Sequence, residues 1–290
     1  MNHKTVRTIA DIARLAGVSK STASRALNDS PLISTETKDR IRAIAEEHQY
    51  RIHIPARNLS LQQSHTIAFV THSYVCRPQG GYSLEDIFLL EILGAVSSTL
   101  TNHNYDLLMV SVDPQDLEWV NRYLGTGRVD GFILLTSTHK PTHIQALVKS
   151  QAPFIIWGPP PPDASYCSVR GDNLAGGRLA VEHLIRTGRK RIAFLGGPRQ
   201  EIEVSDRYKG YAAGLRAAGL AVDPALVSYG WFSIASATER MKKLLEAVPD
   251  LDAVFANSDL MASQAIRILQ QSGRRVPEDV AVMGYADLSL

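Results

Sequence analysis

The sequence predicts an α/β protein whose second, larger part carries doubly wound parallel sheets and whose first part is a small helical domain. Residues 8–48 place apolar side chains at helical spacing in three short segments. From Thr66 onward, short apolar runs alternate with amphipathic helical segments, a pattern typical of parallel sheets covered by helices on both faces. The length of 290 residues also favours two domains over one.

Each of the three short helices begins at a residue suited to capping it. Thr8 precedes the first helix, with Asp11 placed as the acid of a capping box, and Gly17 ends that helix. Ser19 and Ser34 stand where the second and third helices begin. The third helix is expected to bury one stripe, Ile41, Ile44, Ala45 and His48. Two short helices joined by a tight glycine turn are typical of a helix-turn-helix, which we expect in residues 1–50.

The larger part is expected to form two lobes, about 65–160 and 161–290, behind a linker at 51–64. Expected strands cover 67–70, 107–112, 132–135, 154–157, 192–195, 253–256 and 280–283. Expected helices cover 86–102, 114–124, 141–150, 173–187, 205–218, 235–247 and 259–272. The run at 158–162 contains four prolines in a row, which excludes a helix or a central strand and indicates a stiff connector between the lobes.

Charge is distributed unevenly along the chain. The total is only +2, but residues 1–60 hold ten basic and six acidic side chains, a balance of +4. The remaining 230 residues therefore carry −2. A basic first domain on a slightly acidic body indicates a polyanionic partner, such as double-stranded DNA, at the first domain.

Cysteine usage and hydropathy predict a cytoplasmic protein with no membrane segment. Cys76 and Cys167 lie far apart, which favours neither a disulfide framework nor a zinc site. The first residues lack the apolar run of a signal peptide, and no stretch approaches the roughly 18 apolar residues of a membrane helix.

The sequence contains none of the motifs that would indicate an enzyme. Dinucleotide, phosphate-loop, zinc-protease and nucleophile-elbow patterns are missing, so we expect no catalytic residues and no cofactor. His139 and His143 have metal-like spacing, but Pro141 between them favours a loop, and we expect no metal site. Three alternatives stay open. The protein could be an enzyme, which turnover of a bound ligand would reveal, or a transport-type binding protein, whose role in the cell would not need residues 1–60. It could also be a DNA-architectural protein without a ligand, in which case no metabolite would shift its thermal midpoint.

Motifs along nearly the whole chain resemble the lactose repressor/purine repressor family of transcription regulators. The similar stretches include residues 8–28, 171–193, 257–262 and 276–285, in the family's order. The resemblance implies a helix-turn-helix followed by a two-lobed domain like that of periplasmic sugar-binding proteins, with the effector between the lobes. It further implies a homodimer that represses transcription from a pseudo-palindromic operator, under control of a small effector such as a sugar or a sugar derivative.

The resemblance also implies which residues meet DNA. A recognition helix reads base edges with its first residues, which are Lys20 and Ser21 here, with Arg25 one turn later. The expected phosphate contacts are Thr8, Ser19, Thr22 and Ser34, of which Thr8, Ser19 and Ser34 can equally serve only as caps. In this family a hinge helix forms after the third helix and a leucine enters the minor groove; Leu59, close to Arg57, holds that position.

Effector contacts are expected just beyond the carboxyl ends of the strands, because ligands of doubly wound sheets bind there. By this rule the expected contacts are His72, Ser73, Ser137 and Asp259. The resemblance implies Arg207 and Phe232 as further contacts, at the family's cleft arginine and stacking aromatic. Asp172, which can equally cap a helix, and Asp287 complete the expected set. The chain departs from the family in three places. Ile52-His53 replaces a Pro-Asn pair in the hinge, and Ala286 replaces an effector-binding aspartate. The sequence also stops at Leu290, about one crossover before the family's usual end, so the second lobe is expected to be incomplete, either because the sequence is a fragment or because the lobe lacks an element that normally completes it.

Overall fold

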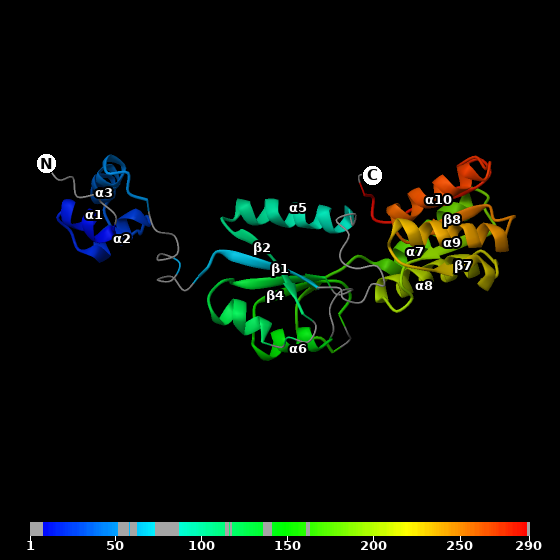
Figure 1. Ribbon diagram of the computed structural model, residues 1–290, viewed down its shortest axis with the longest axis horizontal. Helices are drawn as coiled ribbons and strands as arrows, with labels where there is room; N and C mark the ends of the chain where they lie inside the picture. Colours follow the sequence, from blue (N-terminus) through cyan, green and yellow to red (C-terminus); the bar gives the residue numbers. More distant parts are fainter. Residues whose placement is uncertain are drawn as a thin grey trace. The chain divides into compact units, whose positions relative to one another are not determined.

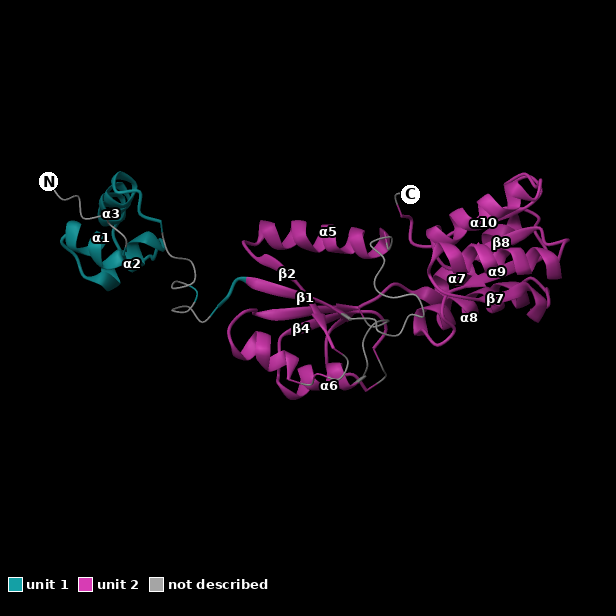
Figure 2. Cartoon of the chain, viewed as in Figure 1, with its two compact units in different colours: residues 1–65 teal, residues 66–290 magenta. Residues whose placement is uncertain are grey.

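The computed structural model divides the chain into two compact units, residues 1–65 and 66–290 (Figure 1, Figure 2). The structure describes residues 8–51, 58, 63–72, 87–113, 116, 118–135, 141–160 and 163–288. In the described part of the chain, no helix is long and apolar enough to cross a membrane.

Among its described residues, the first unit contains the three predicted helices. Its helices are α1 (Ile9–Leu15), α2 (Lys20–Leu27) and α3 (Thr35–Glu47). They share a small core of buried residues: Ile12, Ala16, Ala26, Ile41 and Ala45. Placing His48 in the inner stripe of the third helix was wrong, because this residue caps the end of α3 and is exposed.

The second unit begins with a five-stranded parallel sheet. Its strands are β1 (Thr66–His72), β2 (Asp106–Val112), β3 (Gly131–Leu135), β4 (Phe154–Trp157) and β5 (Ser168–Val169), in the order β2-β1-β3-β4-β5. Helices α5 (Ile87–Asn102) and α6 (Pro141–Lys149) lie on opposite sides of it (Figure 1). Successive side chains of β1 point to opposite faces of the sheet, so β1 contacts both helices. Phe69 packs against α5, whereas Val70 belongs to the cluster that packs against α6.

A second parallel sheet follows, with four strands in the order β7-β6-β8-β9. The strands are β6 (Ile192–Gly196), β7 (Val227–Tyr229), β8 (Ala253–Ala256) and β9 (Ala281–Met283). Helices α7 (Asn173–Arg186) and α8 (Ile202–Ala217) cover the face that carries Phe194 and Phe255. Helices α9 (Ile234–Ala247) and α10 (Asp259–Gln271) cover the face that carries Leu195 and Val254. The predicted doubly wound architecture is therefore confirmed.

Some expected elements differ from the observed ones. Strands β5 and β7 were not predicted, and residue 160, the expected lobe boundary, falls between β4 and β5 of the first sheet. In the expected helix at 114–124, a π-helical turn spans Asn121–Gly125. The expected helix at 141–150 is present as α6, so reading Pro141 as part of a loop was wrong, and His143 is buried on that helix. Proline suits a first helical turn because its missing N–H has no acceptor there.

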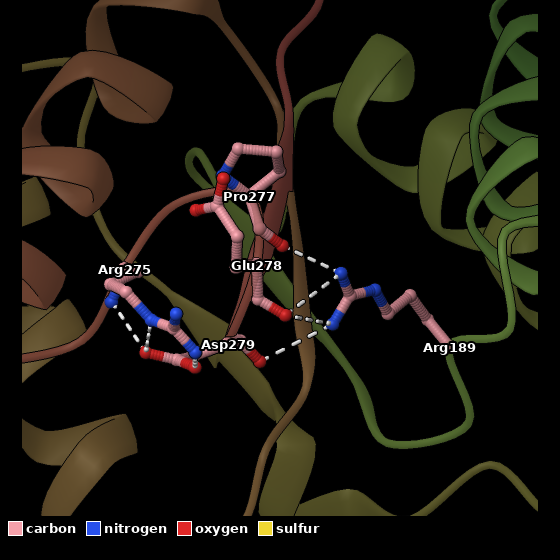
Figure 3. Close-up of polar contacts among 5 residues, drawn as sticks. All are labelled: Arg189, Arg275, Pro277, Glu278 and Asp279. Carbon is pink, nitrogen blue, oxygen red and sulfur yellow. Dashed lines mark hydrogen bonds and ion pairs between the residues drawn. The ribbon is translucent and has the colours of Figure 1, made fainter.

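One arginine fastens the turn that leads into β9. Arg189 donates from Nη2 to the carbonyl oxygen of Pro277 at 2.6 Å, and from Nη1 to those of Glu278 and Asp279 at 3.3 Å each (Figure 3). The same turn is closed by Arg275, which bonds the Asp279 carboxylate through Nη2 at 2.7 Å and lowers the pKa of that carboxyl to about 2. Two guanidinium groups thus fix the last connection of the sheet.

Replacing Arg189 by alanine is expected to lower the free energy of unfolding of the second unit by about 1–3 kcal/mol, because carbonyl oxygens of three residues lose a charged donor. Urea denaturation followed by far-UV circular dichroism measures this. The matched control is Lys190→Ala, which removes an exposed cation next in sequence. Equal midpoints for the two variants would contradict the role assigned to Arg189.

Candidate functional site

The N-terminal end of α2 presents polar and cationic side chains outward. Lys20, Ser21 and Arg25 are exposed, whereas Ala23 and Ala26 on the other side of the helix are buried in the core of the first unit. The first turn of α2 contains no acidic residue. Together with the positive end of the helix dipole, this makes the start of α2 suited to enter the groove of a polyanion.

The predicted caps are confirmed. Ser19 Oγ accepts a hydrogen bond from the backbone N–H of Thr22 at 3.0 Å, and the hydroxyls of Ser21 and Thr22 lie 2.8 and 2.9 Å from it. Ser34 caps α3, and Thr8 forms a capping box at α1. These hydroxyls therefore fix where each helix starts. Their contact with phosphate stays a prediction.

An ion-pair cluster holds two other cations of the first unit. The carboxylate of Asp29 lies 3.0 Å from Lys38 Nζ and 2.7 Å from Arg42 Nη2. Hydrogen bonds from Lys38 and then Arg42, followed by their charges, lower the pKa of Asp29. These contacts fasten the end of α2 to α3. They leave Lys20 and Arg25 as the cations that α2 itself presents to solvent.

Replacing Ser19 by alanine is expected to cost about 1 kcal/mol of local stability, because α2 loses its N-terminal hydrogen-bond acceptor. Faster hydrogen exchange of the α2 amides in the intact chain measures this loss. Ser24→Ala removes a hydroxyl from the interior of the same helix and serves as the control. Unchanged exchange in the Ser19 variant would mean that the cap is not needed to form α2.

Arg207 is the centre of a polar cluster at the carboxyl edge of the second sheet. From α8, its Nε donates to Asn173 Oδ1 at 2.8 Å, at the start of α7. Its Nη1 donates to the backbone oxygen of Asn257, just after β8, at 2.6 Å. Its guanidinium carbon lies 3.8 Å from the ring centroid of Tyr285, which follows β9. Ligands of doubly wound sheets bind at this edge.

The electrostatics of Arg207 are set by partial burial. Burial lowers the pKa of the guanidinium, whereas Tyr285 and then the charges of Glu203 and Glu201 raise it. An arginine side chain nevertheless keeps its proton in a protein. Arg207 is only partly exposed, so it is a fixed positive charge held at this edge of the sheet.

Asp259 and Phe232, also predicted, have partners of their own. Asp259 begins α10, its backbone N–H donates to the Tyr285 carbonyl at 3.1 Å, and its Oδ2 accepts from the N–H of Leu288 at 2.8 Å. Its carboxylate thus helps to fix the segment after β9, next to the Arg207 cluster. Phe232 packs against the α9–α10 core. Its ring packs closely against the backbone of Gly197, where a Cβ would collide with the ring.

The other predicted effector residues do not join this cluster among the described residues. Asp172 is exposed and caps α7, its Oδ1 accepting from the N–H of Ala175 at 2.9 Å. Asp287 is exposed and has a positive φ of 58°. His72 ends β1, and its side chain lies outside the description. The remaining predictions, Arg57, Leu59, Ser73 and Ser137, lie outside the described residues.

Three residues of the cluster were missed as site candidates: Asn173, Asn257 and Tyr285. Asn257 directly follows β8 and Tyr285 comes shortly after β9. Ligand contacts are expected just beyond the ends of strands, so the sequence would have allowed both residues to be predicted. Asn173 has a weaker signal, because only the fold places the start of α7 beside α8.

Comparison with known proteins gives the same architecture. Residues 8–52 match the bacterial regulatory proteins of the lacI family, and residues 82–290 match the periplasmic binding proteins and sugar binding domain of the LacI family. The transcriptional regulator CelR of Thermobifida fusca is 37% identical over 284 residues, covering 97% of this chain and 82% of CelR. The ribose operon repressor of Escherichia coli K12 is 31% identical, covering 98% and 84%.

Solved structures agree with this. A CelR–cellobiose complex is similar with a TM-score of 0.66 at 35% identity, covering 97% of this chain and 83% of that one. The lac repressor dimer bound to operator and an anti-inducer is similar with a TM-score of 0.78 at 25% identity, with the same coverage of both chains. On its sequence, its helix-turn-helix and its paired parallel sheets, this chain belongs to the LacI family of bacterial regulatory proteins.

Proposed function

We propose that this chain is a cytoplasmic transcriptional repressor whose affinity for an operator is controlled by a small effector, a sugar or a sugar derivative. One observation carries the proposal: the same chain joins a helix-turn-helix with exposed Lys20 and Arg25 to a doubly wound domain with Arg207 at its ligand-binding edge. The first arrangement suits DNA, and the second suits a polar metabolite.

At the DNA end, α2 lies in the major groove in this proposal. Lys20, Ser21 and Arg25 contact base edges, while Thr8, Ser19, Thr22 and Ser34 lie near phosphates. A homodimer places two such helices in successive major grooves, which requires a pseudo-palindromic operator. The solved lac repressor relative is a dimer bound to operator, which supports this assembly.

Leu59, close to Arg57 in the linker, is proposed to enter the minor groove at the centre of the operator. Replacing Leu59 by alanine is expected to weaken binding to the operator more than binding to random duplex, because only a specific complex deforms the central base step. Fluorescence anisotropy with both duplexes measures the ratio. Loss by the same factor on the two duplexes would remove Leu59 from the minor groove.

At the effector end, Arg207 and Asp259 are proposed as principal contacts, with Phe232, Asp172, His72, Ser73, Ser137 and Asp287 as further ones. The CelR relative was solved with cellobiose, which supports a carbohydrate ligand. Effector binding must favour one of two states of the protein, since a ligand shifts an equilibrium only through its different affinity for the two states.

The experiment that tests the proposed function is a titration of sugars and sugar derivatives into the complex of the intact protein with its selected operator. The expected result is a saturable change in operator affinity by at least one ligand, lost on Arg207→Ala while operator binding persists. Operator binding that responds to no metabolite in a broad panel would contradict control by an effector. A full response in Arg207→Ala would remove that residue from the site.

A further inference from the structure

Asp29 places an exposed carboxylate just beyond the end of α2, the helix that is proposed to read DNA. The residue follows Asn28, the C-cap of α2, and its backbone is left-handed, with a φ of 59°. Apart from glycine, asparagine and aspartate enter this region most readily. An aspartate here therefore adds a negative charge that an asparagine of the same size and backbone preference would not.

Two cations of α3 are held by this one residue. Lys38 Nζ lies 3.0 Å from Asp29 Oδ1 and donates to the Asp29 backbone carbonyl at 3.3 Å, and the lysine side chain is only 14% exposed. Arg42 Nη2 donates to the same Oδ1 at 2.7 Å. A second carboxylate, that of Asp39, lies 4.0 Å from Arg42 Nη1. Asp29 thus neutralises Arg42 and turns Lys38 back onto the loop between α2 and α3.

This group of charges lies close to the place where the first unit is proposed to meet the DNA backbone. The eight residues of α2 make it about 12 Å long, which is also about the width of the major groove. With Lys20 at the bases, the other end of α2 lies at the rim of the groove, where the phosphates are. On α3, Lys38 comes one turn after Ser34, a proposed neighbour of a phosphate, and its backbone N–H donates to the Ser34 carbonyl.

We propose that Asp29 limits the sequence-independent affinity of the first unit for DNA by holding Arg42, and in part Lys38, away from the phosphates. This inference rests on the proposed function, in which α2 enters the major groove. A cation that pairs with a phosphate releases counterions and strengthens binding to every duplex, whatever its sequence. An arginine already paired with a carboxylate does so less, and the carboxylate itself is repelled by the phosphates. Asp29 is thus a positioning residue for the charges of α3 and not a contact to a base.

The test is Asp29→Asn in the intact protein, with binding to a random duplex and to the selected operator followed by fluorescence anisotropy at several chloride concentrations. The slope of log affinity against log salt should steepen by about 1, because Arg42 is released to pair with a phosphate while Lys38 keeps its bond to the backbone carbonyl. A steepening of about 1 makes the loss of affinity between about 50 and 200 mM salt about fourfold larger. Both duplexes should gain affinity at the lower salt concentration.

Two further variants separate this role from a purely structural one. Adding Arg42→Ala to Asp29→Asn should return the slope to that of the wild type, whereas the effect of a folding defect would persist. Asp39→Asn removes another exposed carboxylate of α3, at the longer distance from Arg42, and should steepen the slope less. An unchanged slope in Asp29→Asn, or a steeper slope that Arg42→Ala does not reverse, would overturn the proposal.

The same measurements show separately whether the proposed function fails. If the wild type binds the selected operator no more tightly than the random duplex, α2 does not read a sequence, whatever Asp29→Asn does to the slope. If the operator is preferred and Asp29→Asn leaves the slope unchanged, the first unit reads a sequence and the inference about Asp29 is wrong.

Discussion

Replacing Gly210 by alanine is expected to destabilise the second sheet and its helices severely, because two helix backbones lie against each other there. A Cβ at Gly210 of α8 would lie under 3.0 Å from the carbonyl oxygen of Leu174 and from the backbone nitrogen of Arg178, both on α7. A Cβ at Gly177 of α7 would likewise lie under 3.0 Å from the carbonyl oxygen of Arg207. Backbone atoms cannot rotate away as a side chain does, so the added methyl group must push the helices apart.

The expected cost is about 1–3 kcal/mol or more, a large share of a typical stability of about 5–15 kcal/mol. Alanine recovers only about 1 kcal/mol through its better helix propensity. Effector binding should be lost as well, because Arg207 and Asn173 lie on the two helices that separate.

The matched control is Gly94→Ala in α5, where an added Cβ would meet nothing within 4 Å. Only the higher helix propensity of alanine then changes the stability, so this variant should be up to about 1 kcal/mol more stable than the wild type. Urea denaturation of the intact chain compares the two. A Gly210 variant that unfolds at the same urea concentration as the Gly94 variant would mean that α7 and α8 do not pack as closely as the structure has them.

Replacing Lys20 by alanine is expected to relax the base preference at one position of each operator half-site. Lys20 is exposed at the first position of α2, from which a side chain reaches base edges in the major groove. Losing a specific base contact costs about 1–3 kcal/mol, which is roughly 5- to 150-fold in affinity for the preferred site. A library of operators varied at single positions measures where the preference is lost.

Arg42→Ala is the control for charge alone, because Arg42 is also exposed but lies on α3, where it is paired with Asp29. Its loss should lower affinity little and equally across the library. If the Lys20 variant also lost affinity uniformly over all operators, Lys20 would be a phosphate contact and not a base reader.

The elements that could be predicted from the sequence are those whose buried residues form an apolar run or an amphipathic pattern. The strand at 253–256 consists of buried apolar residues and was predicted with its observed bounds, and its neighbours were placed within a few residues. Strands β5 and β7 were missed because they are two and three residues long and contain serine, so they have no apolar run. His48 was assigned to the core because its spacing is helical, although the helix ends just before it.

The candidate site was predictable in part. Arg207 followed from the family resemblance, but its partners Asn173 and Asn257 lie 34 and 50 residues away in sequence. Only the folded sheet brings these residues close to Arg207, and no local sequence pattern predicts that they are neighbours. The pairing of Asp29 with Arg42, on which the inference about DNA affinity depends, was likewise available only from the structure.

The most direct test of the central claim, that this chain is a dimeric sequence-specific regulator, is selection of binding sites from a pool of random duplex DNA by the intact protein. The account predicts enrichment of one two-fold symmetric sequence, bound by two chains through α2 of each. Diffuse enrichment without symmetry, with affinity that depends steeply on salt for every duplex alike, would contradict it.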